Sequence, residues 1–200
     1  MHYRTLAAVL LVAVAAAGAR AQQEFSEGEA ESLRQKLQVI IDRAAAEAPP
    51  PRTPLVTSVS DREVNAYLRH VVGPDLPAGL VDPTIAIADR GRLGFRAKVD
   101  LDAVRKSRAR GALDPLSYVS GTLELVLNGT LEAARGRGTF ALESATLGGV
   151  PVPQSLVQEL VTYMTRTPEN PVGISLSEPF ELPAAIQQIR TRPGHATIVQ

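Results

Sequence analysis

The chain has 200 residues, which is enough for one ordinary domain with a core of its own. Apolar residues make up 44% of the chain and aromatic residues only 4%, so the core must be mainly aliphatic. The formal net charge is zero, which gives no electrostatic reason to expect a nucleic-acid partner.

Residues 1–21 have the three-part pattern of a secretory signal peptide. Arg4 supplies a positive start, an unbroken apolar run covers residues 6–17, and Ala19 and Ala21 form a small-x-small cleavage site. The apolar run is shorter than the roughly 20 residues that span a bilayer. The pattern predicts cleavage after Ala21 and a soluble periplasmic or secreted protein without disulfides, since the chain has no cysteine. An uncleaved membrane anchor is the alternative.

A first helix is predicted over residues 22–48, where apolar residues recur at helical spacing. Ser26 and Glu29 have the spacing of a capping box, in which each side chain binds the other residue's backbone N–H group. The helix ends at the proline-rich run "APPPRTP", which has no helical option and predicts a stiff linker. Residues 22–56 are therefore expected to form an N-terminal helix and a linker.

A second helix is predicted from "SVSDREVNAYLRH". Ser60 and Glu63 repeat the capping box, and Gly73 with Pro74 is expected to stop the helix. One apolar face is predicted for it, made of Val64, Tyr67, Leu68 and Val71.

The apolar period then changes from helical to two. Residues 84–102 alternate apolar and polar side chains on both sides of a turn at residues 89–92, and a second such pattern surrounds the turn at residues 134–138. Alternation of this kind predicts two long antiparallel hairpins, each with one apolar face. The basic stretch between them, residues 102–115, predicts a loop with a short helical turn.

Two glycines and two prolines in residues 148–153 end the sheet, and a third helix follows. A sheet with one apolar face must be covered, so we expect this helix to fold back onto the hairpins. The inward side chains would then line an apolar groove: Phe95, Val99, Leu123, Leu125, Leu127, Leu156, Leu160 and Met164.

Motifs for catalysis or for metal and nucleotide binding are missing from the sequence. It contains no zinc-helix motif, nucleophile elbow, phosphate loop or dinucleotide fingerprint. His70 and His195 are isolated, and Asp100 with Asp102 is better interpreted as a solvated polar face than as a cation site. We therefore expect a non-enzymatic protein with no cofactor and no metal.

The strongest charge feature is the group of four bases between the hairpins: Arg105, Lys106, Arg108 and Arg110. Two interpretations stay open for them. They belong to a solvated connector, or they contact anionic lipid head groups, to which each base near the surface contributes about 1 kcal/mol.

Three segments resemble the LmeA-like and YceB-like periplasmic proteins. "SDREVNAYLRH" is similar to their Ser-x-x-Glu-hydrophobic-Asn-x-Tyr/Phe-Leu helix, and "LGGVPVPQSLVQELV" to the segment and helix that follow their hairpins. "PFELPAAIQQIRTRPGHATIVQ" is similar to their closing strands. The resemblance covers residues 57–200 and contains no catalytic residue. It implies a single α+β domain in which a long curved antiparallel sheet wraps around a helix, a tubular (TULIP-like) architecture that binds phospholipids or similar amphiphiles.

The sequence thus predicts an exported protein that holds a lipid or other apolar small molecule between sheet and helix. The alternative is a structural or assembly module of the cell envelope, with a closed core and a protein partner. The two remain open because an apolar sheet face has the same pattern whether it contacts leucine or an acyl chain.

Overall fold

The computed structural model describes residues 25–46, 53–76, 78–107, 120–158, 175 and 178–200. The predicted signal peptide, most of the proline-rich run, Arg108, Arg110, Leu160 and Met164 lie outside these residues. None of the helices in the described ranges is both long and apolar enough to cross a membrane.

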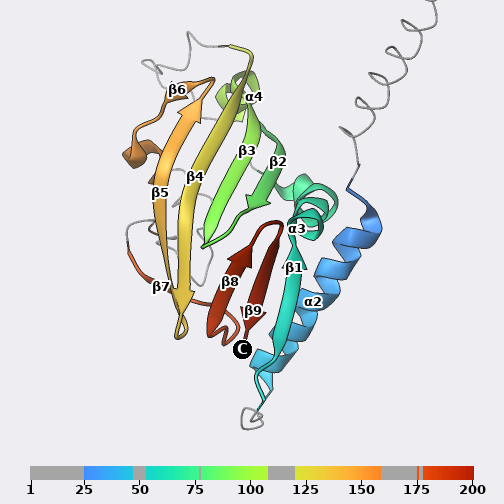
Figure 1. The fold of residues 1–200 in the computed structure, drawn as a ribbon. Coiled ribbons are helices and arrows are strands. Elements are labelled where there is room, and N and C mark those ends of the chain that lie inside the picture. Colours follow the sequence, from blue (N-terminus) through green and yellow to red (C-terminus); the bar gives the residue numbers. More distant parts are fainter. Residues whose placement is uncertain (1–24, 47–52, 77, 108–119, 159–174, 176–177) are drawn as a thin grey trace, which may run out of the picture.

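The described residues form an α+β fold built on one large antiparallel sheet (Figure 1). Its strands are β1 (Val56–Ser60), β2 (Leu80–Ile87), β3 (Arg92–Asp100), β4 (Thr122–Ala134), β5 (Arg137–Leu147), β6 (Val150–Pro151), β7 (Phe180–Glu181), β8 (Gln188–Arg192) and β9 (His195–Val199). The helical elements are α2 (Glu27–Ala45), α3 (Asp61–Tyr67), the π turn η1 (Leu68–Val72), the 3-10 turn η2 (Gly73–Asp75) and α4 (Leu101–Ser107).

The longest strand, β4, organises the sheet. On one side it pairs with β5, and on the other it pairs first with β3 and then, at Ala133 and Ala134, with β8. The hairpins β2–β3 and β8–β9 therefore lie end to end along the same edge of β4 (Figure 1). Two hydrogen bonds join their ends: Gly194 N–H donates to the Ile87 carbonyl at 2.8 Å, and Gly91 N–H donates to Thr191 Oγ1 at 2.6 Å.

Both predicted hairpins are confirmed, as β2–β3 and β4–β5. The β4–β5 turn places Arg135 and Gly136 at φ of 54° and 76°. Positive φ at both central residues gives the turn the twist that suits two antiparallel strands. The polar stretch between the hairpins begins with α4, which bears out the predicted helical turn in that segment.

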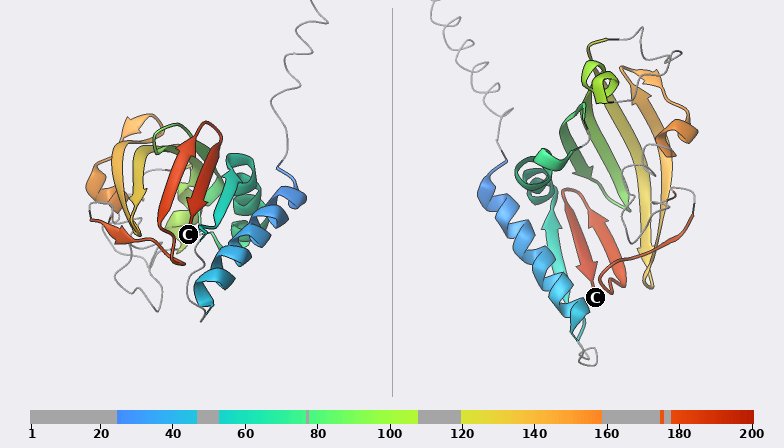
Figure 2. Two further views of the ribbon diagram at one scale, coloured as in Figure 1. Left: turned by 60° about the horizontal axis from the view of Figure 1, so that its bottom comes forward. Right: turned by 180° about the vertical axis from the view of Figure 1, so that it is seen from behind.

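The sheet is not strongly curled (Figure 2). The wrapping of a long curved sheet around a helix, which the family resemblance implies, is therefore not seen in the described part of the chain. Strong curvature needs bulges or glycine kinks repeated on neighbouring strands. The described long strands have two register shifts, one between Val81 and Thr84 and one between Asn128 and Gly129.

The predicted first helix is confirmed as α2, and its capping box is formed by Ser26 and Glu29. This helix lies beside β1 and α3 (Figure 1), and Lys36 Nζ donates to the Ser58 carbonyl of β1 at 2.8 Å. Near its end, Ile40 enters a buried cluster with Ala133, Leu182 and Ile186. The helix thus closes the lower part of the core.

The second predicted helix begins as expected, since the Ser60–Glu63 capping box is present. Its most buried side differs from the predicted apolar face: Asn65 and Ala66 are buried, whereas Val71 is exposed. The helical backbone also continues past the predicted stop, because η2 includes Gly73 and Pro74. Proline is tolerated in the first turn of a helical segment, where its missing N–H group has no helical acceptor.

Candidate functional site

One face of the sheet is apolar across four strands. The register places Ile85, Phe95, Leu127 and Ala145 side by side on β2, β3, β4 and β5. Side chains alternate between the two faces of a strand, so the residues that lie between these apolar ones point to the opposite face. That face carries the charged residues. There Lys98 pairs with Asp82 at 3.2 Å.

A hollow of about 220 Å³ opens on this apolar face. Its walls are hydrophobic side chains, chiefly Ile85, Leu93, Phe95, Leu127, Phe140 and Val157. Val157 comes from the helical turn at residues 154–158 and is only 3% exposed, so this turn covers part of the face. The predicted return of the chain onto the sheet is seen here.

Gly129 shapes this hollow. A Cβ atom at this position would collide with the ring of Phe140 and would lie 2.6 Å from the Ala141 carbonyl. The β4–β5 register also shifts here, between Asn128 and Gly129. Glycine therefore lets the Phe140 ring lie close across β4, where it forms one wall of the hollow.

The structure brings together some of the predicted groove residues. Phe95 and Leu127 line the hollow, whereas Leu125 is buried beside it at 7% exposure. Val99 and Leu123 form a cross-strand pair further along β3 and β4 and are outside the lining of the hollow. Leu160 and Met164 are outside the described residues.

The prediction for Leu156 needs correction. This side chain is 54% exposed, and its neighbour Val157 is the residue that contacts the face. Successive residues of a helix point about 100° apart, so the face of the helical turn that meets the sheet differs from the predicted one by about one residue position. The predicted groove lacks Phe140 and Leu142, which both line the hollow. Their period-two spacing on β5 is the sequence signal that would have identified them.

The two aspartates after β3 bind backbone groups. The Asp100 carboxylate accepts from the N–H groups of Asp102 and Ala103 at 2.9 and 3.0 Å, which caps the start of α4. Asp102 Oδ2 accepts from Gly121 N–H at 3.1 Å. In the ranges that the structure describes, no group of three or more histidine or acidic side chains is arranged to hold a metal ion.

Of the four bases proposed for head-group contact, Lys106 is described and is exposed on α4. The side chain of Arg105, together with Arg108 and Arg110, lies outside the described residues. Contact with an anionic membrane stays a prediction.

A carboxylate holds α2 against α3. Glu63 accepts from Lys36 Nζ and from Ser32 Oγ, both at 2.6 Å, and from the Ser60 N–H group at 2.9 Å. Burial of this carboxylate raises its pKa, but the hydrogen bonds from Lys36, Ser32 and Ser60 together outweigh burial and lower the pKa to about 2.

An amide holds α3 against the sheet. Asn65 Oδ1 accepts from the Ile85 N–H group at 2.7 Å, and Asn65 Nδ2 donates to the Ile85 carbonyl at 2.9 Å. The side chain thus takes the place of a neighbouring strand at the outer edge of β2. It fixes Ile85, whose side chain lines the hollow on the apolar face.

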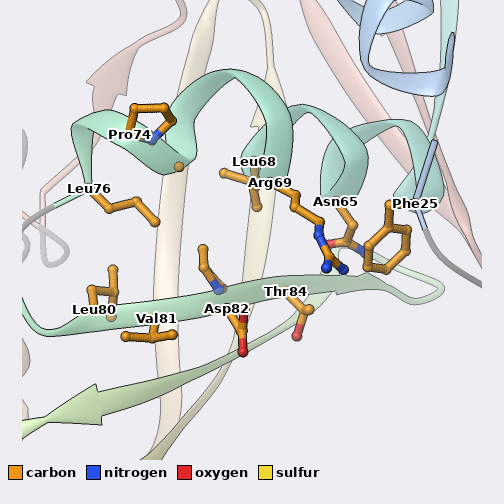
Figure 3. A pocket seen from close by; sticks show the side chains of 12 residues that line it. Phe25, Asn65, Leu68, Arg69, Pro74, Leu76, Leu80, Val81, Asp82 and Thr84 are labelled. Carbon is orange, nitrogen blue, oxygen red and sulfur yellow. The ribbon is translucent and has the colours of Figure 1, made fainter. Parts of the chain in front are cut away.

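A second and larger hollow, of about 490 Å³, lies between β2 and the helical segment from α3 to η2 (Figure 3). It shares no lining residue with the hollow on the apolar face.

Comparison of the chain with protein-family models, with curated proteins and with solved structures finds no match.

Proposed function

We propose that this protein is exported and holds a lipid or other apolar molecule against the apolar face of its sheet, without catalysing a reaction. The observation that carries the proposal is the hollow of about 220 Å³, whose side chains are all hydrophobic. Burial of Val157 against this face supports an arrangement in which sheet and helix enclose the ligand, as in the tubular lipid-binding proteins. Export rests on the signal-peptide pattern of residues 1–21.

The size of the hollow bounds the strength of binding. Pockets that hold whole small ligands usually measure about 300–1,000 Å³. The hollow on the apolar face, at about 220 Å³, suits part of a hydrocarbon chain. Burial of about five methylene groups contributes about 4 kcal/mol, at about 0.8 kcal/mol each. Weak and exchangeable binding of this kind suits a carrier.

Replacing Leu127 by tryptophan is expected to fill the hollow and to weaken uptake of an apolar probe at least about tenfold. Leu127 is half-buried and lines the hollow, so the larger ring has space to occupy. The more deeply buried neighbour Leu125 would instead be overpacked. The measurement is a fluorescence titration with the uncharged dye N-phenyl-1-naphthylamine, with circular dichroism as the check on folding.

Val126→Trp is the matched control, because Val126 is the next residue of β4 and points to the opposite face. It should leave dye binding unchanged. If the folded Leu127→Trp protein takes up dye as well as the wild type does, the face is packed shut, and an assembly module with a protein partner becomes the better account.

A further inference from the structure

The hollow of about 490 Å³ has the size of a pocket for a whole small ligand. One wall is the continuous helical segment of α3, η1 and η2, and the other is the outer side of β2 (Figure 3). Since it shares no lining residue with the sheet-face hollow, a ligand here would form a second site.

The wall that β2 supplies is irregular. Asp82 has a positive φ of 49°, Pro83 follows it, and the pairing with β3 shifts register between Val81 and Thr84. A non-glycine residue in this backbone region is strained and persists where the surroundings hold it. The bulge shapes the strand side of the pocket.

The same stretch of β2 is closed to a further strand. Pro83 has no N–H group to offer, and the N–H and carbonyl groups of Ile85 already bind Asn65. An extended peptide therefore lacks the backbone partners it needs along this edge. The pocket must recognise its ligand through side chains.

Those side chains are amphipathic. Leu68, Leu76 and Leu80 form apolar walls, and Arg69 reaches into the gap between helix and strand (Figure 3). Asp82, the acid in the wall, is already paired with Lys98 at 3.2 Å.

Arg69 differs from Arg62, the other arginine of this helical segment, in its ion pairing. Arg62, on α3, is paired with Glu29 at 2.6 Å. No hydrogen bond or ion pair joins Arg69 to any residue that the structure describes, although its side chain lines the pocket. A guanidinium that no described residue pairs with, placed above apolar walls, is complementary to a molecule with an anionic head and a hydrocarbon body.

We infer that this pocket binds an anionic amphiphile, with the carboxylate or phosphate on Arg69 and the chain along Leu68, Leu76 and Leu80. Arg69 is exposed, so the head group stays near solvent while the chain enters the pocket. This site is separate from the sheet face, and its occupancy does not depend on a ligand there.

The test is isothermal titration calorimetry of the full chain at pH 8 with three probes. Laurate carries both the anion and the chain, monolaurin carries the chain without the charge, and inorganic phosphate carries charge without a chain. A hydrogen bond to a charged group is stronger than one between neutral groups, but the exposure of Arg69 to solvent limits its effect. We therefore expect Arg69→Gln to weaken laurate binding about tenfold and Arg69→Lys to weaken it less.

Arg34→Gln is the matched control, since Arg34 is an exposed helical arginine on α2 and does not line the pocket. It changes the net charge equally and should leave laurate binding unchanged. Monolaurin should bind at least about tenfold more weakly than laurate, and inorganic phosphate should show no comparable binding. Laurate should also shift the backbone amide resonances of the non-proline residues in 68–76 and 80–84.

The inference would be overturned by no laurate binding, by equal laurate affinity of Arg69→Gln and Arg34→Gln, or by resonance shifts confined to the sheet face. Phosphate binding as strong as laurate binding would instead identify a simple anion site and would also refute the amphiphile. If the inference about the Arg69 pocket is wrong, dye uptake by the sheet face is unaffected. If the sheet face does not bind dye, the loss of laurate affinity in Arg69→Gln is still expected.

Discussion

Replacement of Asn65 by alanine is expected to lower the free energy of unfolding by about 3 kcal/mol. The change removes both hydrogen bonds to Ile85 and leaves a backbone donor and a backbone acceptor without their partner. Each buried group left unsatisfied costs about 1–3 kcal/mol. Water from the adjacent hollow of about 490 Å³ can reach these two backbone groups, so their combined cost stays below the maximum that two unsatisfied groups would give. Urea unfolding at pH 7 measures the loss.

Two further variants separate the contributions. Asn65→Asp keeps an acceptor for the Ile85 N–H group but loses the donor to the Ile85 carbonyl, so it should also destabilise the fold. Asn128→Ala removes an exposed amide that binds Ser144 Oγ at 3.0 Å on the polar face, and it should cost less than about 1 kcal/mol. An Asn65→Ala protein within about 1 kcal/mol of the wild type would contradict this role of Asn65.

Glu63 is expected to make stability depend on pH in the acid range. The folded-state pKa of about 2 lies below the ordinary value of 4.5, so the stabilisation is fully present above about pH 4.5 and is lost as the pH falls towards 2. This difference in pKa corresponds to about 3 kcal/mol. The Glu63 side chain is only 12% exposed, so screening by solvent is limited.

Glu63→Gln should therefore be less stable than the wild type by about 3 kcal/mol at pH 7 and nearly equal to it at pH 2. Urea unfolding of both proteins at a series of pH values gives the comparison. Glu132→Gln, on the exposed polar face, serves as the matched control and should follow the wild type throughout. A deficit in Glu63→Gln that is the same at pH 7 and pH 2 would refute the account.

The parts of the fold that the sequence predicts are those set by local interactions. The two capping boxes join residues three positions apart, and both are present, at Ser26 and at Ser60. The hairpins follow from period-two alternation and short turns. The end-to-end contact of the β2–β3 and β8–β9 hairpins was not predicted, because Gly91 and Thr191 are 100 positions apart and neither residue type indicates the other.

The sheet-face hollow was partly predictable for the same reason. Alternation along the strands predicts Phe95 and Leu127 correctly. The apolar stripe does not fix the rotation of the helical turn at residues 154–158, so it predicts Leu156 where the structure has Val157. The sequence gives no signal for Arg69, because what distinguishes this side chain is that no residue in the described ranges pairs with it. Asn65 gave none either, because its partner Ile85 is on another element.

Native mass spectrometry of the protein purified from its own cells tests the central claim most directly. If the sheet face holds a lipid or other apolar molecule, the spectrum should show a mass above that of the chain, and extraction with organic solvent should remove the difference. The Leu127→Trp protein should carry much less of it, because the ring fills the hollow. A wild-type protein with the mass of the bare chain both before and after extraction would contradict the proposed function.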